Sequence, residues 1–141
     1  MTPLRPLALI VAAAMALPGP ATAQGNPVLS FHAAGQQLRL HPGDIADMQL
    51  SENGTAADIH LRVTPDAAAD LAALTGQAIG QPMQVRACGH LLLTPIVRER
   101  IDSGVLYFQE NDAARAKALY TLWQGRTTCA DLDTEMFQNG H

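Results

Sequence analysis

The stretch that decides the fold runs from residue 82 to residue 125 and reads PMQVRACGHLLLTPIVRERIDSGVLYFQENDAARAKALYTLWQG. Alternation at 83–87 and the apolar run LLLTPIV predict two strands joined by a turn at Cys88-Gly89-His90. The run VLYFQ predicts a third strand, and Asn111 is expected to cap an amphipathic helix that ends at Gly125. The stretch therefore predicts three strands followed by a helix.

The second of these strands, LLLTPIV, is apolar throughout, which predicts burial on both faces or packing against a helix. Pro95 cannot donate to a sheet ladder, so the strand is expected to end near Thr94 or to lie at an edge. One short turn of helix is expected at 97–102, before Ser103-Gly104 leads into the third strand.

Upstream, two runs of alternating polarity flank Glu52-Asn53-Gly54 and predict a β-hairpin with one buried face, formed by DIADMQLS and AADIHLRV. Thr64-Pro65-Asp66 predicts the start of a helix, because threonine caps it, proline fits its first turn and aspartate favours its positive end. Its apolar stripe is Ala67, Leu71, Leu74 and Ala78, and Gly80 is the expected stop.

The element order β-β-α-β-β-β-α predicts an α+β fold, with two helices packed on one face of a small, mostly antiparallel sheet. We expect a signal peptide at 1–23, an N-terminal extension at 24–43, an α+β domain at 44–125 and a polar C-terminal tail at 126–141. Within the extension, the short run 28–32 is β-like and the run 37–41 is a second, weaker one.

The first 23 residues have the pattern of a secretory signal peptide, with Arg5, an apolar run from Leu7 to Leu17 and the triplet Ala21-Thr22-Ala23. A membrane anchor is the alternative, but the run is shorter than the ~20 residues that span a bilayer. We expect cleavage after Ala23, a periplasmic location and no stable membrane insertion afterwards.

The charge balance bears on the class of partner. The chain has 9 Lys and Arg against 13 Asp and Glu, a net charge of −4, and removing Arg5 leaves 8 minus 13, or −5. Phosphate-backbone binding needs clustered cationic residues, whereas Lys117 is the only lysine, so a nucleic-acid partner is not expected.

Two cysteines remain in the expected mature chain, Cys88 and Cys129, and an even number in an oxidising compartment favours a disulfide. A redox-active pair is the less favoured alternative, because no C-x-x-C spacing lowers a thiol pKa.

The order and spacing of turn and core residues over 56–125 resembles the head subdomain of the first periplasmic region of SecD, an accessory subunit of the Sec protein-export machinery. The residues that carry the resemblance are Leu71, Thr75, Gly80, Val85, Gly89, Pro95, Ile101, Gly104, Ala113, Ala116, Leu119 and Gly125. The resemblance implies a free-standing homologue of that head, in contact with exported polypeptides or Sec components.

The chain departs from SecD heads in two ways. They usually carry Asp-Gly at the tight turn where this chain has Cys88-Gly89, so either the turn shifts to Gly89-His90 or the disulfide holds it. SecD also has transmembrane helices that use the proton gradient, and no segment after the signal peptide reaches that length here. We therefore do not expect this chain to have the motor activity of SecD. The role that the resemblance still implies is contact with exported polypeptide.

No arrangement for catalysis or metal binding is evident. His32, His41, His60, His90 and His141, with Met48 and Met83, suggest copper ligation, but no two histidines have ligand spacing within one element. Ser30, Ser51 and Ser103 lie outside any nucleophile elbow, and the acidic groups Glu110 with Asp112 and Asp131 with Asp133 and Glu135 are typical of helix starts and a solvated tail. We expect no catalytic, cofactor or metal residue.

The remaining candidates are binding surfaces. A contact patch is predicted from Arg98, Arg100, Tyr107 and Phe108, and strand alternation leaves at most one of the two aromatic residues for the core. Extended polypeptide can add to an exposed sheet edge through main-chain hydrogen bonds. We expect a non-enzymatic binding module. The alternatives are a small metal-binding (His/Met) or hydrolytic periplasmic protein, or a shared fold with an unrelated ligand.

Overall fold

A computed structural model describes residues 26–138. The expected signal peptide and His141 lie outside these residues. The elements, in chain order, are β1 (Leu29–Ala33), β2 (Gln36–Leu40), the 3₁₀ turn η1 (Pro42–Asp44), β3 (Ile45–Asn53), β4 (Ala56–Val63), α1 (Pro65–Gln77), β5 (Gln84–Ala87), β6 (His90–Leu93), β7 (Val105–Glu110), α2 (Ala113–Trp123), η2 (Cys129–Asp131) and α3 (Glu135–Gln138).

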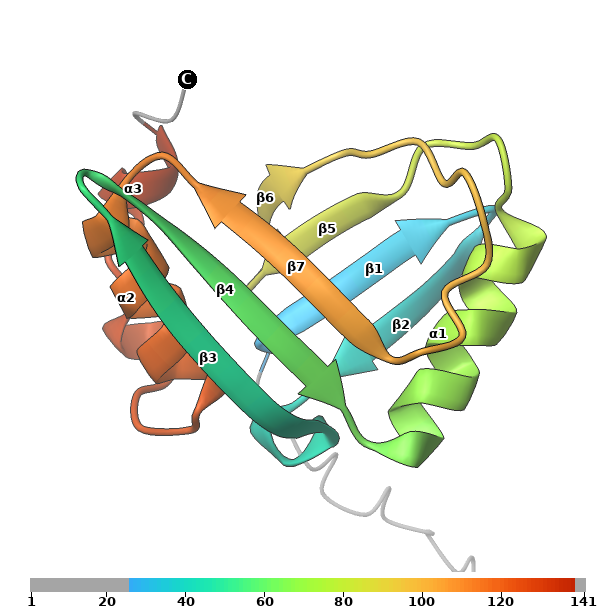
Figure 1. The fold of residues 1–141 in the computed structure, drawn as a ribbon, viewed down its shortest axis with the longest axis horizontal. Helices are drawn as coiled ribbons and strands as arrows, with labels where there is room; N and C mark the ends of the chain where they lie inside the picture. The colour runs from blue at the N-terminus through green and yellow to red at the C-terminus, as the bar shows by residue number, and fades with distance from the viewer. Residues whose placement is uncertain (1–25, 139–141) are drawn as a thin grey trace, which may run out of the picture.

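The strands form two antiparallel sheets, sheet A in the order β2-β1-β5-β6 and sheet B in the order β3-β4-β7. Their inner faces supply one core, and in Figure 1 the strands of sheet B run across those of sheet A. The antiparallel α+β class and the element order over 56–125 are confirmed. The arrangement differs from the single sheet expected, because the strands divide into two sheets and α1 and α2 lie on opposite sides of them (Figure 1).

The β3–β4 hairpin confirms the prediction from alternation. Ile59, Leu61 and Val63 are buried, and the residues between them face outward. A register shift between Ile45 and Asp47 explains why the apolar positions of β3 skip from 45 to 48.

The described part of the expected N-terminal extension belongs to the folded domain, because β1 and β2 form half of sheet A. Leu29 and Phe31 are fully buried in the common core. Ala34 and Gly35 both have positive φ, 52° and 73°, as the tight turn between these strands requires. An alanine in that conformation is uncommon, so the sequence gives a weak signal for this hairpin.

Both long helices begin and end with capping interactions. Thr64 caps α1 by accepting a hydrogen bond from the Ala67 amide. The cap of α2 is Asp112 rather than the expected Asn111: its carboxylate accepts from the Ala114 amide at 2.9 Å, an anionic acceptor that also suits the positive end of a helix. Gly125, at φ 78°, ends α2 as expected.

The turn between β5 and β6 stays at Cys88-Gly89, with φ values of 51° and 82°, and the disulfide between Cys88 and Cys129 is present. The described part of the expected polar tail is folded, because Leu132 is buried and the Phe137 ring stacks on His90 with 4.9 Å between ring centroids. The disulfide thus lies where this segment packs beside β6.

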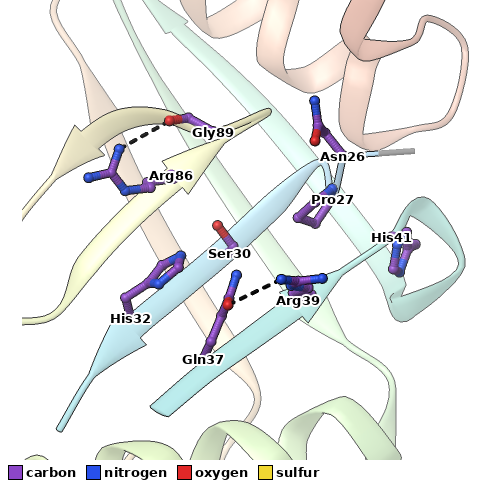
Figure 2. A pocket seen from close by; sticks show the side chains of 9 residues that line it. All are labelled: Asn26, Pro27, Ser30, His32, Gln37, Arg39, His41, Arg86 and Gly89. Atoms are coloured by element: carbon purple, nitrogen blue, oxygen red, sulfur yellow. Dashed lines mark hydrogen bonds between the residues drawn. The ribbon is translucent and has the colours of Figure 1, made fainter. Parts of the chain in front are cut away.

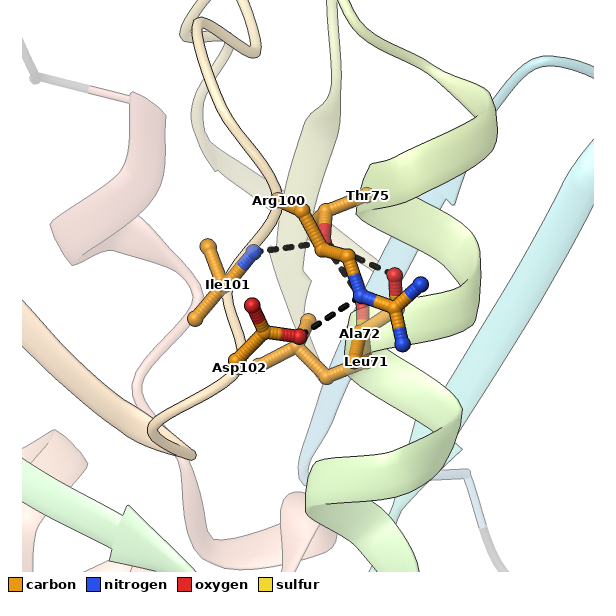
Figure 3. Close-up of polar contacts among 6 residues, drawn as sticks. All are labelled: Leu71, Ala72, Thr75, Arg100, Ile101 and Asp102. Carbon is orange, nitrogen blue, oxygen red and sulfur yellow. Dashed lines mark hydrogen bonds and ion pairs between the residues drawn. The ribbon is translucent and has the colours of Figure 1, made fainter.

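The segment between β6 and β7 contains no helical turn, which corrects the expectation for 97–102. Figure 3 shows how α1 holds it: the buried Thr75 hydroxyl accepts a hydrogen bond from the Ile101 amide at 2.9 Å and donates to the Leu71 carbonyl at 2.8 Å. At the end of the segment, the Gly104 carbonyl accepts from the Val63 amide, which fixes the start of β7.

Candidate functional site

The four residues of the predicted contact patch do not form one surface. Phe108 is only 5% exposed and packs against Trp123 in the core, with 5.2 Å between ring centroids, so it is not available to a partner. Tyr107, its neighbour on the strand, is 48% exposed on the outer face of sheet B. Arg98 and Arg100 are exposed in the segment that leads to β7. The prediction that only one of the aromatic pair joins the core is confirmed.

Arg100 pairs with Asp102 at 2.6 Å, and both side chains are more than half exposed (Figure 3). Such an exposed pair contributes little to stability, because water screens it. Arg98 has no ion-pair partner among residues 26–138. The two arginines therefore give this segment a solvated surface next to β7.

β7 is one of the two edge strands of sheet B, and the hydrogen-bonding pattern shows which of its backbone groups are free. The Val63 amide bonds to the Gly104 carbonyl, so Gly104 faces β4. Backbone groups alternate between the two edges of a strand, so the amides and carbonyls of Val105, Tyr107 and Gln109 point away from the sheet.

These outward groups have few partners. The Val105 amide donates to the Ser103 hydroxyl at 3.2 Å, while the Tyr107 and Gln109 amides have none among residues 26–138. By the same period of two, the side chains of these residues share the outer face of sheet B, where Val105 is 47% exposed. We call Val105, Tyr107 and Gln109, with their outward backbone groups, the β7 edge.

The outer face next to the β7 edge is slightly hollowed and carries both polar and apolar side chains. His60, directly opposite Tyr107 on β4, meets its ring edge-on with 4.5 Å between centroids. A depression of about 220 Å³ beside it is lined by Asp47, Met48, Gln49, His60, Leu61, Arg62 and Val105. The β7 edge therefore has one aromatic and one aliphatic side chain beside a shallow depression of mixed polarity.

The edge strand of sheet A, β6, is also partly apolar at its surface. Leu91 and Leu93 on the strand and Ile96 after it are 40% to 50% exposed. Burial on both faces is therefore wrong for this strand, whereas its expected packing against a helix is met by α3, whose Phe137 stacks on His90. The strand ends at Leu93, near Thr94 as expected, and lies at a sheet edge. The edge strands β6 and β7 and the segment joining them carry most of the large exposed apolar residues, namely Leu91, Leu93, Ile96, Val105 and Tyr107.

The residues considered for catalysis and metal binding are dispersed. Within residues 26–138, no group of three or more His, Cys, Asp or Glu side chains is close enough to hold a metal ion. Met83 is buried in the core. Glu110 is not a solvated helix-start charge: it is 5% exposed and pairs with Arg115 at 2.6 Å, inside the fold. The ion pair with Arg115 explains why the Glu110 carboxylate is buried, so no catalytic role is needed to account for it.

Sequence reasoning singled out Tyr107 but missed Gln109 and His60. The signal for Gln109 was present in the alternation of VLYFQ, which places Val105, Tyr107 and Gln109 on one face. The placement of His60 beside Tyr107 depends on pairing between strands that lie more than forty residues apart, for which the sequence has no local signal.

No protein-family model matches the chain, and no curated protein matches it. Two solved structures are similar in fold, each at 20% sequence identity over 59% of this chain. The first, described as "a membrane component SecDF that enhances protein export", has a TM-score of 0.52, and the match covers 39% of its chain. The second, SecDF in a "super-membrane-facing form", has a TM-score of 0.51 with 12% covered.

This chain therefore spans well under half the length of either SecDF chain. Within residues 26–138, no helix is both long and apolar enough to cross a bilayer. At this level of identity the comparison concerns architecture alone, and it agrees in fold with the resemblance to SecD. The fold of this protein is SecD-like.

Proposed function

We propose that this protein is an accessory module of protein export that binds extended polypeptide segments at the β7 edge. The observation that carries the proposal is the row of outward backbone groups beside exposed Val105 and Tyr107, on a fold similar to part of SecDF. One of the similar structures is described as a component that enhances protein export, and the proposal extends a role in export to this chain.

Adding a strand to the β7 edge suits an exported polypeptide, here called the client, that has not yet folded. An incoming strand would bond to the Tyr107 and Gln109 amides and carbonyls, which requires no particular client sequence. The exposed Tyr107 ring and Val105 side chain would contact alternate side chains of the client and favour apolar or aromatic ones. Binding of this kind is non-enzymatic and needs neither a metal nor a cofactor.

A periplasmic location is part of the proposal. The signal-peptide pattern of residues 1–23 and the disulfide between Cys88 and Cys129 both favour an oxidising compartment outside the cytosol. Exported polypeptides pass through that compartment before they fold, so a module with a free strand edge would meet them there.

The test is photocrosslinking in cells, with a photoreactive amino acid in place of Tyr107. We expect crosslinks to exported polypeptide when secretion is active, and their loss when export is blocked. Gln49 lies in the same cross-strand row but on the other side of β4, so the same substitution at Gln49 is the matched control. Equal crosslinking from both positions, or crosslinks from Tyr107 only to a translocon subunit, would contradict polypeptide binding at this edge.

A proline variant separates backbone bonding from side-chain contact. Gln109→Pro removes one outward amide and leaves the bonds between β7 and β4, so we expect weaker crosslinking with the fold retained. Glu52→Pro, which removes an outward amide from the opposite edge of sheet B, is expected to crosslink as the unaltered protein does.

A further inference from the structure

A polar cavity lies on the outer face of sheet A, apart from the β7 edge of sheet B. It measures about 280 Å³, and its floor is built from two cross-strand rows. One row is Arg39, Ser30 and Arg86, and the other contributes Gln37 and His32. Figure 2 shows the two arginines on opposite sides of Ser30, with His32 alongside.

Both arginines in the cavity have neutral partners. Arg86 donates to the Gly89 carbonyl at 3.1 Å and to the Gln84 side-chain oxygen at 2.9 Å. Arg39 makes one long contact, 3.4 Å, to the Gln37 side-chain oxygen. No carboxylate lies within ion-pair distance of either among residues 26–138. The two guanidinium charges in the cavity thus have no ion-pair partner in the described chain, although the Asp44 carboxylate lies 3.7 Å from the ring of His41, which also lines the cavity.

Ser30, between them, is 3% exposed overall, and its hydroxyl makes no hydrogen bond to another residue among 26–138 and lines the cavity. No fully buried side-chain oxygen in this part of the chain lacks a partner, so the Ser30 hydroxyl is open to the cavity and free to donate to a bound group. Burial, with the nearby charges of Arg86 and Arg39, lowers the pKa of His32 below 6.5, so its ring is neutral at pH 7. A neutral imidazole can still donate one hydrogen bond.

We propose that this cavity binds a phosphate group, held over Ser30 between Arg39 and Arg86. The charge complements two arginines that lack acidic partners, and the Ser30 hydroxyl supplies a donor from the floor. The phosphate would come either from free inorganic phosphate or from the headgroup of an anionic lipid, since both present the same oxyanion.

The arrangement of donors favours phosphate over carboxylate. Arg39 and Arg86 stand on strands at either side of β1, and Ser30 lies below, so donors come from three directions. A phosphate has oxygens in all three directions, whereas a planar carboxylate is matched by a single guanidinium.

The test is calorimetric titration of the purified protein with inorganic phosphate at pH 7. We expect saturable one-to-one binding, weakened about tenfold by Arg39→Gln or Arg86→Gln, because each variant removes a charge-assisted donor. Arg98→Gln makes the same change of charge outside the cavity and is expected to bind as the unaltered protein does. Equal weakening by Arg98→Gln would overturn the site, because it would show attraction by net charge alone.

Two further titrations identify the source and the chemistry. Vesicles of phosphatidylglycerol that bind through Arg39 and Arg86, when inorganic phosphate does not, would assign the phosphate to a lipid headgroup. Succinate binding as tightly as phosphate, with the same dependence on both arginines, would overturn the choice of phosphate. No saturable binding of phosphate or vesicles by correctly folded protein would overturn the proposal. All of these measurements concern the cavity of sheet A, so their outcome is independent of polypeptide binding at Tyr107 and Gln109.

Discussion

The Thr75 hydroxyl accepts a hydrogen bond from the amide of Ile101 at 2.9 Å, which joins helix α1 to the segment that leads into β7. Thr75 is fully buried, and its own proton goes to the Leu71 carbonyl one turn earlier in the helix. The Thr75 side chain therefore gives the Ile101 amide its hydrogen-bond partner. It also fixes the position of the segment that leads into β7.

Thr75→Val keeps the shape of the side chain and removes the acceptor for the Ile101 amide. We expect the free energy of unfolding to fall by about 1–3 kcal/mol, the usual penalty for a polar group that loses its partner. Urea denaturation measures it. Thr121→Val is the control, because that threonine also donates to a carbonyl four residues earlier, but its hydrogen bond is exposed to solvent. If the free energy of unfolding falls equally in both variants, the hydrogen bond from the Ile101 amide contributes nothing to stability.

Gly104, directly before β7, has φ 69°, and a Cβ there would lie 2.8 Å from the Cβ of Ala68 on α1. Gly54 has nearly the same φ, 70°, with open space around it. We expect Gly54→Ala to cost about 1 kcal/mol, from backbone conformation alone. Gly104→Ala adds a clash and is expected to cost about 3 kcal/mol. Equal losses in urea denaturation would show that α1 and β7 are less tightly packed than described.

Removing the disulfide between Cys88 and Cys129 frees a loop with a sequence separation of 41. The chain-entropy model gives a loss of about 4 kcal/mol in the free energy of unfolding. Cys88 also has φ 51°, so we expect Cys88→Gly with Cys129→Ser to be about 1 kcal/mol more stable than Cys88→Ser with Cys129→Ser. Chemical denaturation of both variants checks this. If the variant with Cys88→Ser is the more stable of the two, the positive φ described at Cys88 is contradicted.

Local signals were sufficient for most of the elements. The cap at Thr64, the stop at Gly125, the alternation through Ile59 and Leu61, and the Cys88 disulfide each depend on neighbouring residues or on counting cysteines, and all are confirmed. These features are readable because backbone geometry and hydrogen-bonding needs act over a few residues.

The division of the strands into two sheets could not be predicted from the sequence, because it depends on pairing between strands that are far apart in the chain. β4 pairs with β7 rather than with β5, and β1 pairs with β5 across the whole of β3, β4 and α1. The cavity on sheet A could not be predicted for the same reason: Arg39 and Arg86 come to flank Ser30 only when β2, β1 and β5 align. The Ala34-Gly35 turn also lacked the Asn-Gly or Asp-Gly signature of a tight hairpin.

The pKa of His32 makes stability depend on pH. Burial, Arg86 on β5 and Arg39 on β2 lower that pKa from 6.5, and the other side chains in its row, Gln37 and Gln84, are uncharged. Below pH 6.5 the unfolded chain binds more protons at this site than the folded chain.

We therefore expect the contribution of His32 to stability to be present above pH 6.5 and lost as pH falls through the folded pKa. His32→Gln removes this part of the pH dependence, which urea denaturation across the range measures. Proton NMR of the ring gives the midpoint directly. A midpoint at or above 6.5 in the folded protein would contradict the buried, positively charged surroundings described here.

The central claim is that polypeptide adds to the β7 edge through its outward backbone groups. The most direct measurement is amide NMR with hydrogen exchange, on adding a reduced and carboxymethylated secretory protein that cannot fold. The account predicts that the Tyr107 and Gln109 amides shift and exchange more slowly, while the outward amides of Leu50 and Glu52 on β3 do not change. Unchanged Tyr107 and Gln109 amides at saturating polypeptide would contradict it.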